Sequence, residues 1–120
     1  MTQSQLFSPF DIRGVTLRNR IVVAPMCQYS AIDGLAGDWH LVNLSKFAIG
    51  GAGLVFCEAA GVAPEGRITN GCVGFWNDEM MAPWPRIVDF IKANGAVPAA
   101  QIAHAGRKAS TQRPWEGAGP

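Results

Sequence analysis

The 120-residue sequence predicts an α/β fold in which buried parallel strands alternate with helices. Two observations carry this prediction. Short apolar runs at residues 21–24, 52–59 and 97–103 are each bounded by glycine or proline, which favours buried strands. The segments that begin near residues 38 and 85 repeat apolar side chains at helical spacing. Because strands joined through helices pair in parallel, the order predicts a parallel sheet with right-handed crossovers.

A β-hairpin is expected within residues 6–19, before the first of these strands. Its arms are residues 10–13 and 15–18, and Gly14 supplies the turn between them. A hairpin at this point would plug the bottom of a barrel. The first strand then ends at Pro25, which has no N–H to donate to a neighbouring strand, so the chain is expected to leave the sheet there.

Caps and stop signals predict the bounds of the two helices. Asp38 is suited to cap the first helix, and the glycines at residues 50–51 end it. The second helix is predicted to begin at Pro85, since proline fits the first turn, and to end at Gly95. We interpret His40, inside the first helix, as a capping or core residue rather than a ligand. Asn77 or Asp78 is expected to cap a short turn.

Composition excludes several classes of function. The chain is 48% hydrophobic and 16% charged with a net charge of +1, which indicates a packed interior and no nucleic-acid or membrane partner. No apolar run approaches the length of a membrane span, and no secretory signal is visible at the N-terminus. The 3 cysteines match no zinc-site spacing and form no even set, so reduced thiols in the cytoplasm are expected.

The predicted strand ends carry the side chains of interest. Cys27 and Tyr29 follow the first strand, Glu58 and Ala59 end the second, and Gln101 lies in the third. Sites of parallel barrels lie at this end of the strands, so a shared pocket is predicted. The competing interpretation is structural: a buried thiol, a packed phenol, a paired glutamate, a packing alanine and a backbone-bonded core glutamine.

Two of these residue types suit a flat ligand. Ala59 is small enough for a ring to approach the backbone, and the amide of Gln101 matches a ring edge with both donors and acceptors, such as a pyrimidine. The glycine run at 50–53 ends a helix, which is the wrong direction for a phosphate loop. We interpret His104 and the basic residues at 107–108 as a solvated turn.

Taken together, these segments resemble the Old Yellow Enzyme family of FMN-dependent ene-reductases, and within it the cysteine-containing, thermophilic-like class with its xenobiotic reductases. The resemblance runs from about residue 6 to residue 117. It rests on LRNRI at 17–21, APMCQYS at 24–30, DWH at 38–40, GAGL at 51–54, EA at 58–59, APEGRIT at 63–69 and QIAHAGRK at 101–108. It implies a TIM (β/α)8 barrel with an N-terminal hairpin lid.

The resemblance implies FMN as the cofactor, with NAD(P)H as the hydride donor. By position, Pro25, Met26 and Cys27 would lie against the flavin, and the thiol would tune its potential. Ala59 and Gln101 would contact the flavin ring. The protein contributes positioning and electrostatics, while the hydride chemistry belongs to the cofactor.

The resemblance also implies the reaction and its partners. Hydride passes to the β-carbon of an activated alkene, such as an enone or enal, and nitro compounds are further acceptors. Tyr29 would hydrogen-bond the electron-withdrawing group of this small-molecule substrate, so Tyr29 and Cys27 are the predicted catalytic residues. We expect a cytoplasmic enzyme that is a homo-oligomer in its complete form.

The chain is short for such a barrel, which typically needs about 250 residues. We therefore interpret residues 1–120 as the N-terminal portion of a single FMN-binding TIM-barrel domain: a hairpin lid, about three strands and two helices. By resemblance, the remaining site residues lie beyond residue 120, so the chain alone is expected to be inactive. The alternative is a non-catalytic barrel fragment or a self-associating α/β module that pairs its open sheet edges.

Overall fold

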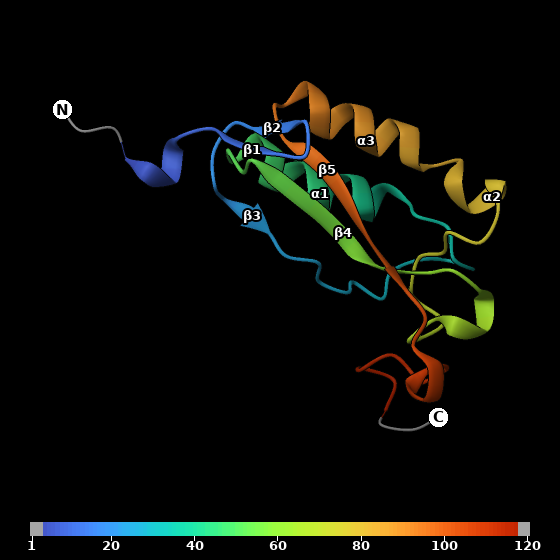
Figure 1. Ribbon diagram of the computed structural model, residues 1–120. Coiled ribbons are helices and arrows are strands. Elements are labelled where there is room, and N and C mark those ends of the chain that lie inside the picture. Colours follow the sequence, from blue (N-terminus) through green and yellow to red (C-terminus); the bar gives the residue numbers. More distant parts are fainter. Residues whose placement is uncertain (1–3, 118–120) are drawn as a thin grey trace.

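The computed structural model describes residues 4–117, in which three parallel strands form one sheet in the order β3-β4-β5 (Figure 1). The strands are β3 (Val22–Val23), β4 (Leu54–Gly61) and β5 (Val97–Ala103). Helix α1 (Asp38–Ile49) connects β3 to β4, and α3 (Trp84–Ala93) connects β4 to β5. The predicted alternation of parallel strands and helices is confirmed.

The core lies where α1 and α3 pack on the sheet. Strand β4 contributes Val55 and Ala60, which are almost inaccessible to solvent. Leu44 of α1 and Ile87 and Ile91 of α3 meet them from the helical layer. Burying each large aliphatic side chain contributes about 1.5–3 kcal/mol, so this layer is the main source of stability.

The hairpin lies beside the N-terminal ends of the strands (Figure 1). Strands β1 (Phe10–Ile12) and β2 (Val15–Leu17) pair antiparallel, as predicted. The guanidinium of Arg18, just after β2, donates to the carbonyl oxygens of Ala48 at 2.6 Å and Asn94 at 2.8 Å. One side chain thereby ties the hairpin to the ends of both long helices. The hairpin is held at the N-terminal ends of the strands, the end predicted to be the bottom of the barrel.

Two predicted boundaries are corrected in the helices. Asp38 does not cap α1 but is its first residue, and Gly37 is the N-cap. The reason is that Nδ1 of His40 accepts the N–H of Gly37 at 3.0 Å, which closes the first turn from within the helix. Helix α3 begins at Trp84 rather than at Pro85, which lies in the first turn where its missing N–H has no helical partner.

The second strand lies two residues further along the chain than predicted. It occupies Leu54–Gly61 rather than 52–59, because Ala52 and Gly53 form the turn that leaves α1. Glu58 and Ala59 are therefore inside β4 and do not end it. The first strand is also shorter than predicted, with two residues.

The connections contain short helical turns. Helix α2 (Asp78–Met81) is capped by Asn77, whose Oδ1 accepts the N–H of Met80 at 3.0 Å. Turns of 3-10 helix occur at Gln5–Phe7, Pro64–Gly66 and Gly106–Lys108. Among residues 4–117, no helix combines the length and the apolar character that crossing a membrane requires.

Candidate functional site

The carboxyl halves of the three strands bring the predicted site residues together. The thiol of Cys27, beyond β3, lies at the backbone of Ala59 in β4. Ala59 is in turn the register partner of Gln101 in β5. Residues from three separate segments therefore line up across the sheet, in the order in which the strands lie.

A β-bulge in β4 sets this alignment. Phe56 pairs with Ala99, and Ala59 pairs with Gln101. Between these pairs, β4 therefore contains one residue more than β5. The bulge breaks strict alternation, and the consecutive residues Cys57 and Glu58 are both buried. It thereby turns the carboxylate of Glu58 into the interior while Ala59 keeps its place beside Gln101.

Cys27 has a sulfur neighbour that the sequence did not reveal. Its thiol lies beside that of Cys72, which is 1% exposed and accepts the N–H of Thr69 at 3.5 Å. The hydrogen bonds from Cys27 and then from Thr69 lower the pKa of Cys72 to about 6. The bond to Cys72 and burial raise the pKa of Cys27, so Cys27 is a neutral thiol at neutral pH.

Tyr29 is held in an unusual backbone conformation. Its φ of 53° lies in the left-handed region, which is strained for a residue with a side chain. A Cβ on Gly71 would lie 2.4 Å from the carbonyl oxygen of Tyr29, so only glycine allows the two segments to approach this closely. Ala31 secures the approach by donating its N–H to Gly71 O at 2.9 Å.

The ring of Tyr29 packs edge-on against Trp115, with 6.1 Å between the ring centroids. Trp115 belongs to the tail, so the tail borders the site, a contact that the sequence reading could not place. Burial and the neighbouring Cys27 and Cys72 thiols raise the pKa of Tyr29. Its phenol consequently keeps its proton at neutral pH and remains a hydrogen-bond donor.

Met26 and Gln101 are the most accessible of the predicted cofactor residues. Met26 is 51% exposed, and Gln101 is exposed as well. Within residues 4–117, the amide of Gln101 makes no hydrogen bond to another residue. The interpretation of Gln101 as a backbone-bonded core glutamine is therefore wrong, because β5 has a single neighbouring strand among the described residues.

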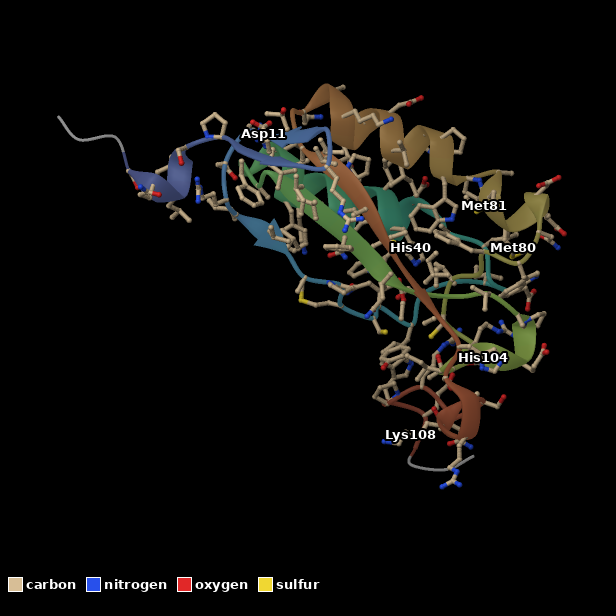
Figure 2. The ribbon with its side chains drawn as sticks, viewed as in Figure 1. Asp11, His40, Met80, Met81, His104 and Lys108 are labelled. Atoms are coloured by element: carbon tan, nitrogen blue, oxygen red, sulfur yellow. The ribbon has the colours of Figure 1, made fainter. Side chains whose placement is uncertain are left out.

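The two histidines have different surroundings (Figure 2). His40 is 2% exposed on the inner side of α1, and its prediction as a capping and core residue is confirmed. His104 follows β5 at the lower end of the molecule, where it accepts the N–H of Gly106 at 3.1 Å. His104 and the neighbouring Lys108 are exposed, as expected for a solvated basic turn.

The profile of the NADH:flavin oxidoreductase / NADH oxidase family matches residues 5–119, and the chain belongs to this family. Among curated relatives, it is 51% identical to an NADPH dehydrogenase of Bacillus cytotoxicus over 108 residues, which cover 88% of this chain and 31% of the relative. It is 46% identical to an NADH:flavin oxidoreductase of Gibberella zeae over 112 residues, covering 93% and 27% of the two chains. The chain thus spans about a third or less of the length of these relatives.

Solved structures agree with this assignment. Morphinone reductase in complex with tetrahydroNAD aligns with a TM-score of 0.80 at 28% identity, covering 89% of this chain and 29% of that one. Old Yellow Enzyme from Pichia sp. aligns with a TM-score of 0.81 at 26% identity, covering 88% and 28%. The recognition of the Old Yellow Enzyme family, with its FMN cofactor, and of the N-terminal part of its barrel is therefore confirmed.

Proposed function

We propose that the complete protein containing this chain is an ene-reductase, which transfers hydride from NAD(P)H through FMN to activated C=C bonds such as those of α,β-unsaturated carbonyls. The observation that carries the proposal is the alignment of Cys27, which follows β3, with Ala59 in β4 and Gln101 in β5, and with Tyr29 beside them. A small enone, enal or nitro compound is the proposed substrate, and the cytoplasm the proposed location.

The residues at this edge suit a flavin. Ala59 is small and buried, so a flat ring can lie close to the backbone above it. The exposed amide of Gln101 can donate and accept at a pyrimidine edge. Pro25, Met26 and Cys27 form the adjoining wall at the exit of β3. When bound, FMN would supply the hydride chemistry, and these residues would bind and orient it.

Tyr29 and Cys27 have the protonation states that the proposed roles require. The raised pKa of Tyr29 keeps its phenol protonated, so it can donate to a substrate carbonyl oxygen and stabilise negative charge that develops there. The raised pKa of Cys27 keeps the thiol neutral, so Cys27 adds no charge next to the ring. Cys27 would therefore act on the flavin potential as a weak S–H dipole.

A self-associating α/β module is the second candidate. It is favoured by strand β5, which has a single neighbour within residues 4–117 and carries Ile102 at 69% exposure. An exposed edge with apolar side chains promotes pairing between chains. The same surface would equally be covered by further strands and helices of a complete barrel, which is the arrangement that we propose.

Anaerobic turnover of the complete protein tests the proposal. We expect bound FMN, oxidation of NADPH or NADH when cyclohexenone is added, and a saturated ketone as the product. Tyr29→Phe is expected to lower kcat/KM for the enone about tenfold, the loss of one hydrogen bond to developing charge, while flavin reduction by NAD(P)H changes less. Cys27→Ala is expected to shift the flavin potential with the fold retained.

The two candidates separate in a size measurement on the 120-residue chain. A discrete oligomer that unfolds cooperatively and binds no flavin would support the self-associating module.

In the turnover assay of the complete protein, flavin reduction without any product from the enone would contradict the proposed substrate class, while leaving the oxidoreductase assignment in place.

A further inference from the structure

A buried carboxylate lies directly behind the loop at residues 25–29. Glu58 is 3% exposed, and its Oε2 accepts the backbone N–H of Gln28 at 3.1 Å. Its Oε1 lies 3.2 Å from Nε2 of His40, with both side chains 2% exposed, although the two atoms are not aligned as a hydrogen bond. Burial of an ionisable pair is costly unless donors surround the charge, so the arrangement calls for a reason.

The hydrogen bonds assign the proton of His40. Nδ1 of His40 accepts the N–H of Gly37 at 3.0 Å and therefore carries no proton. The imidazole must then be neutral, with its proton on Nε2, which faces Glu58. Both carboxyl oxygens of Glu58 face donors, Oε2 the N–H of Gln28 and Oε1 Nε2 of His40, which is the arrangement that suits an acceptor-only carboxylate.

A third donor lies near this charge. Trp84 of α3 lines the same small cavity as Glu58, His40, Met26 and Gln28. Its indole N–H is buried and, within residues 4–117, has no hydrogen-bond partner, which is also true of Nε2 of His40 and Oε1 of Glu58. The cavity therefore joins α1, β4 and α3 to the exit of β3 around one carboxylate.

The position of Gln28 makes this contact important. Its N–H lies in the chain between Cys27 and Tyr29, so a single hydrogen bond restrains both predicted catalytic residues. Tyr29 has a strained left-handed conformation, which persists only where neighbouring contacts enforce it. A hydrogen bond to a charged acceptor is among the strongest contacts available for that purpose.

We propose that Glu58 is a positioning residue for the flavin: its buried carboxylate, oriented by His40, fixes the Gln28 amide and thereby sets where Met26 and Cys27 meet the ring. The inference rests on the proposed function, and it adds that the fixed negative charge lies on the protein side of the same loop. Removing this charge should make the flavin easier to reduce, because reduction adds negative charge to the ring.

Replacement of Glu58 in the complete, FMN-loaded protein tests the inference. In Glu58→Gln, we expect the Kd for FMN to rise at least tenfold and the flavin potential to move to a more positive value. Glu65→Gln is the matched control. Glu65 is exposed, so this substitution removes the same charge at a position outside the site. The control should change the Kd less than twofold and leave the potential in place.

A folded Glu58→Gln protein with unchanged Kd and potential would overturn the inference. If that variant does not fold, NMR of the unsubstituted apoprotein decides: a protonated Nε2 on His40 and slow exchange of the Gln28 amide support it. A protonated Nδ1 or a freely exchanging Gln28 amide overturns it. Failure of the unsubstituted protein to bind FMN would contradict the proposed function, whereas equal binding by Glu58→Gln contradicts only this inference.

Discussion

Strands β4 and β5 are neighbours in one sheet, yet their side chains meet different surroundings. β4 pairs on both sides, and Cys57 to Gly61 are all buried. Within residues 4–117, β5 pairs on one side only, and its residues 100–102 are exposed. Position in the sheet, rather than composition, makes this difference, since both strands are largely apolar in sequence.

The comparison explains how the two strands contribute to the site. The groups of β4 are oriented by this chain itself: Glu58 accepts a hydrogen bond from Gln28 and lies against His40, and Ala59 borders Cys27. Gln101 of β5 has no such support among the described residues. The side chains of β4 at the site are therefore oriented by contacts within this chain, whereas Gln101 of β5 has no such contact among the described residues.

The largest effect is expected from a charge placed on each strand. Val55→Asp should prevent folding, because an unpaired carboxylate at a 1% exposed position costs several kcal/mol, comparable to the stability of a small domain. Ile102→Asp, at 69% exposure, should leave the circular dichroism of the 120-residue chain unchanged. In the complete barrel, the same change should lower Tm. Equal tolerance of both changes in the chain would remove the proposed difference between the strands.

A smaller effect is expected at Gln101. Gln101→Ala should weaken FMN binding by about 1 kcal/mol, roughly fivefold, because one neutral hydrogen-bonding group is lost without any rearrangement of the core. The stability of the apoprotein should stay within about 0.5 kcal/mol. Gln112→Ala, another exposed glutamine, is the control in the FMN titration. A loss of stability larger than the loss of binding would show that Gln101 is structural.

The smallest effect concerns the thiol pair and depends on pH. Cys72 has its pKa lowered from 9.0 to about 6, so its thiolate is favoured by folding. That stability is complete above pH 9.0, declines as pH falls and is lost below about pH 6. The free energy of unfolding should therefore rise with pH across this window more steeply than in Cys72→Ser. Urea titrations at several pH values measure this, and parallel curves for the two proteins would contradict it.

The titration of Cys27 itself lies above this pH window. Its raised pKa means that its contribution is complete below pH 9.0 and is lost only at higher pH. Because the interaction with Cys27 is the main cause of the lowered pKa of Cys72, Cys27→Ala should reduce the slope between pH 6 and 9 towards that of Cys72→Ser.

The elements that depend on local sequence were predicted well. Strand β5 spans 97–103 as predicted, since the helix-ending glycine before it and the apolar run itself define the bounds of the strand. Boundaries that depend on a partner were predicted less well. The N-cap of α1 is Gly37 rather than the predicted Asp38, because the ring of His40 accepts the N–H of Gly37. Strand β4 begins two residues later than predicted, because Ala52 belongs to the turn after α1.

By itself, the sequence determined the strand and helix order, the family and the side chains at the strand exits, because each is written in short contiguous motifs. The tertiary structure alone decided which distant residues meet there. Cys72 reaches Cys27, Trp115 packs on Tyr29, and Glu58 turns inward at the β4 bulge. Such contacts follow from strand register and loop path, which depend on the packing of the whole chain and leave no local pattern.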